Sequence, residues 1–172
     1  HVHHINLMQQ LLGAEVAGIK LHVPIDTVIR RNHIHHCSMG LWLDWVAQGT
    51  RVSANLLHDN QLPEGLDRSR QRFMSQDIFM EASLGPTLID NNLLLSDVSI
   101  RFAAQGVACV HNLICGSFTS VGDGTDQIAN GINQPRYFSY HYPHRTELIG
   151  FKSCLHGDNR FYNNLYVQRW PM

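Results

Sequence analysis

Charge is scarce in this chain of 172 residues, and neither sign prevails. Only 16% of the residues are charged, and 13 Lys and Arg against 14 Asp and Glu leave a formal net charge of −1. That balance argues against partners such as nucleic acids and anionic membranes, which require a basic surface. Low charge with 44% hydrophobic residues also excludes disorder and coiled coil. No run of about 18 apolar residues is present, so we expect no membrane span.

Cysteine is also sparse and shows no paired spacing. The four cysteines form no CxxC pair, and we expect buried free thiols at Cys37, Cys109, Cys115 and Cys154. Reduced thiols weakly favour a cytoplasmic location. The chain begins at His1 rather than Met, so we expect a piece of a longer protein, with about one domain's worth of residues.

Histidine, by contrast, is abundant, with 12 residues, several of them in HVHH at 1–4 and HIHHC at 33–37. A closed zinc site needs four ligands at suitable spacing. His33 and His35 share a strand face, but the sequence places no second pair beside them. We therefore predict no metal and no cofactor.

A short pattern recurs along the chain: an apolar residue, two variable residues, Asn, one variable residue and an apolar residue. It appears in IRRNHI (29–34), VSANLL (52–57), LIDNNL (88–93), CVHNLI (109–114) and, more loosely, RFYNNL (160–165). The repeated asparagines are Asn32, Asn55, Asn91, Asn112 and Asn163, separated by 23, 36, 21 and 51 residues. Short strands every 20-odd residues, with asparagines able to form a ladder, predict an all-β fold. We predict a right-handed parallel β-helix with coils of about 22 residues and loop insertions.

Two segments interrupt this rhythm. Residues 61–75 hold Pro63, Gly65 and five charges, and we predict an inserted surface loop. Residues 116–147, rich in Gly, Asn, Tyr and His, predict a long loop on one side of the solenoid. The whole of 1–172 is interpreted as part of one β-helix catalytic domain, with the last Asn separation covering about two coils and an excursion.

Counting back ten or eleven residues from the first four asparagines reaches an ionisable residue each time. These residues are His22, Asp44, Glu81 and Arg101, each in an alternating segment whose apolar positions point inward. Stacking predicts an outer row in that order, with the Asp44 and Glu81 Cα atoms about 5 Å apart. Two carboxylates so close raise one pKa, which gives the acid and the carboxylate that glycosidic cleavage uses. An ordinary solvated face is the alternative interpretation.

The segments LWLDWVAQGTRVSANLLHDN (41–60) and QDIFMEASLGPTLIDNN (76–92) resemble glycoside hydrolase family 120. GAEVAGIKLH (13–22) and HGDNRFYNNLYV (156–167) look similar too. The resemblance implies an exo-acting β-xylosidase on a right-handed parallel β-helix, which trims xylose from xylo-oligosaccharides with retention of configuration. By motif match, Asp44 is the nucleophile and Glu81 the general acid/base. One departure is that 61–75 looks inserted relative to the family.

Six further residues are candidates for substrate binding: Trp45, Trp42, His22, Lys20, Glu15 and Arg101. The role of Arg101 stays open between substrate and a pair with Glu81. Two other functions also remain open. A polysaccharide lyase would use Asp44 and Glu81 to hold calcium, and a non-catalytic β-helix would bind glycans without cleavage. The oligomeric state is undetermined, with a homo-oligomer among the options.

Overall fold

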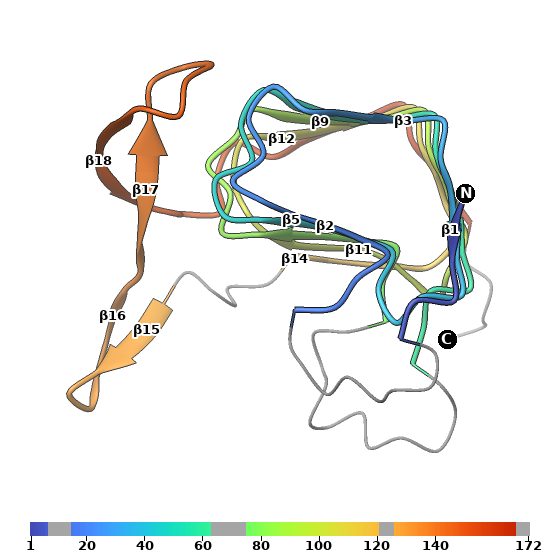
Figure 1. The fold of residues 1–172 in the computed structure, drawn as a ribbon, viewed down its shortest axis with the longest axis horizontal. Helices are drawn as coiled ribbons and strands as arrows, with labels where there is room; N and C mark the ends of the chain where they lie inside the picture. Colours follow the sequence, from blue (N-terminus) through green and yellow to red (C-terminus); the bar gives the residue numbers. More distant parts are fainter. Residues whose placement is uncertain (7–14, 63–74, 121–125, 168–172) are drawn as a thin grey trace.

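The computed structural model describes residues 1–6, 15–62, 75–120 and 126–167. Three parallel sheets form the sides of a solenoid, and the strands within each sheet stack along its axis (Figure 1). Sheet 1 contains β2 (Ile19–His22), β5 (Leu41–Asp44), β8 (Ile78–Glu81), β11 (Val98–Ala103) and β14 (Ser117–Ser120). Sheet 2 contains β3 (Val28–Arg30), β6 (Thr50–Ser53), β9 (Thr87–Asp90), β12 (Val107–Val110) and β19 (Arg160–Tyr162). Sheet 3 contains β1 (Val2–His3), β4 (His33–His35), β7 (Leu56–His58), β10 (Leu93–Leu94), β13 (Leu113–Ile114) and β20 (Leu165–Tyr166).

The chain passes through sheets 1, 2 and 3 in turn, and each complete pass forms one coil of a right-handed parallel β-helix (Figure 1). The predicted fold class is therefore confirmed. The strands are short, with two to six residues each, and each strand pairs with its equivalent in the next coil. Among the described residues no helix is long and apolar enough to cross a membrane.

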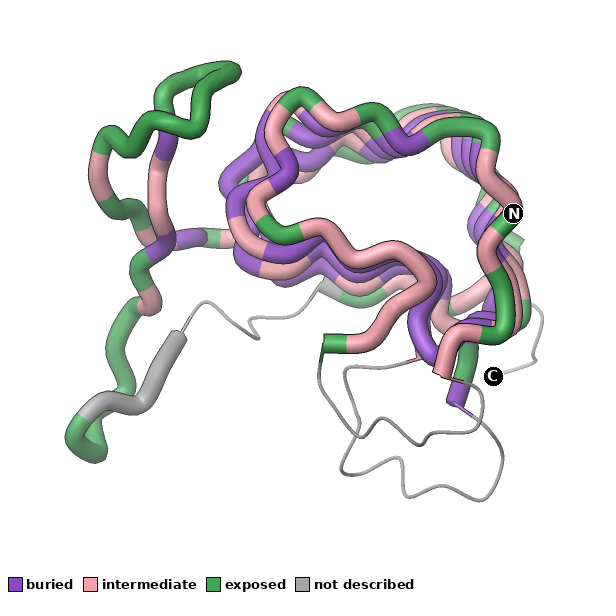
Figure 2. Tube along the Cα trace, viewed as in Figure 1, coloured by how far each residue is buried: buried purple, intermediate pink, exposed green. Residues whose placement is uncertain are grey.

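The interior of the coils is filled by alternate residues of all three sheets, as a period of two requires. Figure 2 shows the buried segments repeating from coil to coil. The stacked core includes Leu41, Leu43, Ile78, Met80, Ile100 and Phe102 from sheet 1, Val52 and Ile89 from sheet 2, and Ile34, Leu57 and Leu94 from sheet 3. The intervening side chains of sheet 1 consequently point outward, and these carry the candidate chemistry.

An asparagine ladder marks the turn between sheets 2 and 3, at Asn32, Asn55, Asn92, Asn112 and Asn164. Each amide Nδ2 donates to the next Oδ1 over 2.9–3.1 Å. The choice of Asn91 and Asn163 as ladder residues was wrong by one position. Both have positive φ, 55° and 52°, and so do Arg31, Ala54 and His111, which precede the other ladder residues. Asn tolerates this left-handed conformation, which explains why two asparagines stand side by side there.

The final coil is interrupted between β14 and β19. Asn112 bonds directly to Asn164, so their separation is one coil plus an excursion, not two coils. Within 116–147, where we expected a loop, the chain forms β14, a first hairpin and the first strand of a second hairpin, which is completed at 148–153. The hairpins are β15 (Asp126–Ala129) with β16 (Ile132–Pro135), and β17 (Tyr137–His141) with β18 (Leu148–Ser153), on the left in Figure 1. Most of the proposed insertion at 61–75 lies outside the described residues.

Candidate active site

Asp44 and Glu81 are direct partners on neighbouring strands of sheet 1. The register aligns His22 with Asp44 and Asp44 with Glu81, as the counting from the asparagines predicts. Each carboxylate ends its strand, at the corner where the chain turns toward sheet 2. Parallel pairing at about 4.8 Å therefore brings the two side chains out of the same face, one coil apart.

Arg101 does not continue this row, because Ala103 is the residue opposite Glu81. Arg101 lies opposite Phe79, with its guanidinium carbon 5.7 Å from the ring centroid. The turn that follows β11 contains three residues (104–106), whereas the turn after β8 contains five (82–86). Counting from the asparagine assumes equal turns, so it placed Arg101 two residues too far along the strand. Arg101 stays on the outer face, in a neighbouring row.

Two side-chain nitrogen atoms lie beside one oxygen of Asp44. Lys20 Nζ lies 2.7 Å from Asp44 Oδ2, and His22 Nδ1 lies 3.2 Å from the same oxygen. Glu15 forms an ion pair with Lys20 and is itself mostly exposed. The other oxygen, Asp44 Oδ1, is buried and accepts no hydrogen bond from the described residues. Lys20 and His22 thus hold the Asp44 carboxyl group in place through Oδ2.

The surroundings of Glu81 differ from those of Asp44, because they raise the pKa of its carboxyl group. Burial raises the pKa of its carboxyl group, and the neighbouring Asp44 carboxylate raises it further. The guanidinium of Arg136 acts in the other direction and lowers that pKa. The net effect on the pKa of Glu81 is upward, which favours the protonated form of its carboxyl group.

The two tryptophans have different surroundings. Trp42 is buried on the outer side of sheet 1 against Phe79, with ring centroids 5.4 Å apart, and Lys20 lies over its ring at 4.2 Å. Trp45 is half-buried at the turn after Asp44 and contacts Phe138 edge-to-face at 5.1 Å. Trp45 is therefore the more accessible of the two aromatic surfaces.

The hairpin β17–β18 contributes residues that sequence reasoning did not select. Phe138 and Cys154 pack against Val46, Ala82 and Leu84 at the corner beside the carboxylates. This packing brings Arg136 to 4.7 Å from the Trp45 ring centroid, and its charge acts on Glu81. Arg136 lies within the predicted long loop at 116–147, and no local pattern connects it to the carboxylates.

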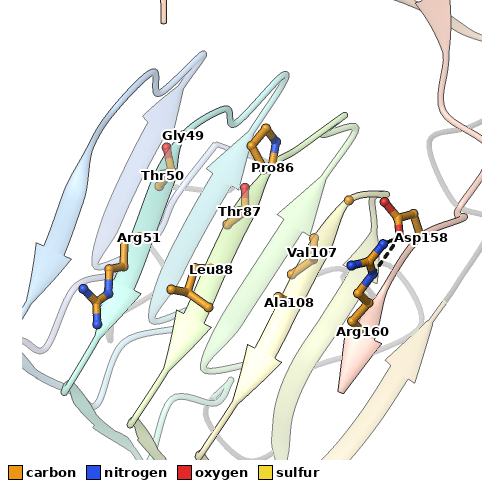
Figure 3. Close-up of a pocket in the computed structure, with 11 residues that line it drawn as sticks. Gly49, Thr50, Arg51, Pro86, Thr87, Leu88, Val107, Ala108, Asp158 and Arg160 are labelled. Carbon is orange, nitrogen blue, oxygen red and sulfur yellow. Dashed lines mark hydrogen bonds and ion pairs between the residues drawn. The ribbon is translucent and has the colours of Figure 1, made fainter. Parts of the chain in front are cut away.

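A pocket lies on the outer face of sheet 2, away from the carboxylate pair. Figure 3 shows this hollow of about 450 Å³, lined in part by Thr50, Leu88 and Val107. The basic groups there are paired, Arg160 with Asp158 at 2.8 Å and Arg51 with Asp90 at 2.7 Å. Since no facing carboxylates line it among the described residues, the candidate active site is the pair on sheet 1.

These features define the class of protein: it is a parallel β-helix in which two carboxylates on neighbouring coils have different environments. A solved structure of XylC in complex with xylose is similar to this chain, with 42% sequence identity and a TM-score of 0.74. The match covers 93% of this chain and 21% of the XylC chain, so the chain spans about a fifth of that protein. No family model and no curated protein matches the sequence.

Proposed function

We propose that this chain is the catalytic segment of a retaining, exo-acting β-xylosidase that releases xylose from xylo-oligosaccharides. The observation that carries the proposal is the pairing of Asp44 with Glu81 in adjacent coils, with Lys20 and His22 on Asp44 and a raised pKa at Glu81. The resemblance to glycoside hydrolase family 120 and the similarity to XylC, solved with xylose, support the sugar class.

In the first step, Glu81 donates its proton to the glycosidic oxygen while Asp44 attacks the anomeric carbon. The leaving sugar departs as an alcohol, and a glycosyl ester forms on Asp44. The attacking group is the Asp44 side chain, which Lys20 and His22 hold in place through Oδ2. Glu81, now ionised, then removes a proton from water, which attacks the ester and regenerates both carboxyl groups. Neighbouring coils suit the separation of about 5–5.5 Å that retaining enzymes use.

The remaining residues would bind and orient the sugar. Trp45 offers an aromatic face at the corner, beside His22. Lys20 and His22 contact Asp44 and would also bind a sugar hydroxyl there. Glu15 would act through Lys20. Trp42 and Arg101 stay candidates on the outer face, in the row next to the carboxylates.

Azide rescue in the intact protein tests the assignment of roles. Glu81→Ala should lose far more activity on xylobiose than on an activated aryl xyloside, because a poor leaving group needs the proton most. Azide needs no general base, so it should restore turnover and give β-xylosyl azide. Asp44→Ala should lower turnover by several orders of magnitude, and azide should give the α anomer. Glu147→Gln, an exposed carboxylate on the hairpin, is the matched control and should behave as wild type.

Different results would identify the alternatives. No azide product from either variant, with equal losses on both substrates, would refute the nucleophile and acid roles. An unsaturated, ultraviolet-absorbing product that disappears with a chelator would identify a lyase. Binding of xylo-oligosaccharides with no release of xylose, unchanged by Asp44→Ala except in affinity, would identify a non-catalytic module.

A further inference from the structure

Seven of the 12 histidines gather at the first strands of sheet 3, on a different sheet from the carboxylate pair. They are His1, His3, His4, His33, His35, His36 and His58. The parallel register aligns His3 with His35 and His35 with His58. Because Ile34 and Leu57 point into the core, the flanking histidines of β4 and β7 lie on the outer face. The sequence analysis placed no further histidines beside His33 and His35. In the structure, β7 and the chain at β1 bring such histidines to them.

Four of these imidazoles, from His1, His33, His35 and His58, form a compact group that we call the imidazole cluster. Nε2 of His1 lies 2.6 Å from Nε2 of His35, and Nε2 of His33 lies 2.6 Å from Nε2 of His58. The rings of His1 and His33 are stacked, with an interplanar angle of 8°, as are those of His35 and His58, with 2°. Ligand atoms of His1, His33 and His35 all lie within 4.8 Å of one another.

The two closest nitrogen pairs of the imidazole cluster are shorter than the ligand pairs of a bound transition metal. Zinc binds imidazole nitrogen at about 2.0–2.1 Å, so tetrahedral ligand atoms stand about 3.4 Å apart. The two measured nitrogen pairs, at 2.6 Å, are shorter than that value, so ring rotation would have to open them around an ion. His58 also lies within 4.8 Å of ligand atoms of His36 and Asp59, and its contact with His33 joins it to the other three imidazoles.

Asp59 orients the ring of His58. Its Oδ2 lies 2.6 Å from His58 Nδ1, and since an ionised carboxylate only accepts, Nδ1 must carry the proton. In the neutral ring, the lone pair of His58 is then on Nε2, the atom that faces His33. A carboxylate that fixes the tautomer of a histidine in this way is the usual outer partner of a metal ligand. Burial and neighbouring imidazoles lower the pKa of His33 and His35, which keeps both rings neutral.

We propose that the imidazole cluster binds one divalent transition-metal ion of the Zn²⁺ class, with His33, His35, His58 and His1 as ligands. Imidazole suits zinc, copper and nickel, whereas magnesium and calcium prefer oxygen. The ligands come from three successive strands of sheet 3, β4, β7 and the chain just before β1, so the ion would connect three neighbouring coils. The site is separate from the proposed glycosidase chemistry.

Calorimetric titration of the metal-free intact protein with zinc chloride tests the site. We expect one ion per chain and a rise in unfolding temperature with zinc. The double variant His33→Gln/His35→Gln should lower affinity at least 100-fold, and Asp59→Asn should lower it about 10–100-fold. His111→Gln replaces an exposed histidine outside the cluster and should leave affinity unchanged. Magnesium chloride should produce no binding at the same concentration, and zinc affinity should fall at pH 5 as protons compete.

Three outcomes would overturn the proposal. These are no stoichiometric zinc binding, zinc binding that survives the double variant, or an equal loss in His111→Gln. Far-UV circular dichroism checks that each variant folds. Should the double variant not fold, Asp59→Asn decides alone, because Asp59 is exposed and lies beside the cluster; unchanged affinity in that variant would also reject the site.

Discussion

The asparagine ladder can be tested by comparing Asn91 and Asn92, which are adjacent residues of the same type but differ in burial and in hydrogen bonding. The Asn92 side chain is fully buried and forms four hydrogen bonds of 2.9–3.0 Å. Its Oδ1 accepts from the backbone and side-chain amides of Asn55, and its Nδ2 donates to Val52 O and Asn112 Oδ1. Asn91 is exposed and donates one bond of 2.8 Å to Asp90.

Asn92→Ala should lower the free energy of unfolding by about 3–5 kcal/mol. Each lost hydrogen bond contributes about 0.5–1.5 kcal/mol, and a buried group left unpaired costs about 1–3 kcal/mol. The Asn55 N–H and the Val52 carbonyl would be left unpaired in this way. Asn91→Gly should cost less than about 1 kcal/mol, because glycine adopts the positive φ of 55° without strain.

Urea unfolding of the intact protein, followed by far-UV circular dichroism, compares the two variants. Hydrogen exchange adds local resolution, because coils of a solenoid depend mainly on their neighbours and protection should fall first in β6, β9 and β12. If Asn91→Gly destabilises as much as Asn92→Ala, the ladder is not the stabilising feature and the reasoning is refuted.

Three further predictions concern titrating groups. Burial raises the pKa of Asp77 from 3.8 to about 6. The protonated group therefore contributes fully to the free energy of unfolding below pH 4, and this contribution of about 3 kcal/mol is lost as the pH rises through 6. Asp77→Asn should flatten urea stability across that window, and an unchanged slope would contradict the assignment. Arg136 lowers the pKa of Glu81, so Arg136→Gln should move the alkaline limb of kcat/KM to higher pH; a shift to lower pH would contradict it. Burial raises the pKa of Cys109 to about 12, so iodoacetamide at pH 8 should label this thiol only after unfolding, as mass spectrometry would show.

Much of the architecture and the central pair could be predicted from the sequence, because the relevant information is local. Alternating apolar residues and recurring asparagines define a coil and its register, and this was enough to place Asp44 opposite Glu81. The same counting failed wherever turn lengths differ. Because the turn at 104–106 is short, Arg101 lies opposite Phe79 and not opposite Glu81. Because residues 91 and 92 are both asparagines, the sequence pattern did not distinguish which of them joins the ladder.

Other features were decided by contacts between segments distant in sequence, which no local pattern encodes. Arg136 acts on Glu81 because Phe138 packs onto the corner at Val46 and Ala82. His1, His33 and His58 meet because parallel pairing of β1, β4 and β7 stacks equivalent positions about 4.8 Å apart. Residue type and spacing therefore determined the coil and its carboxylate pair, whereas only the stacking of coils and the docking of the hairpin decided which charged and aromatic side chains surround them.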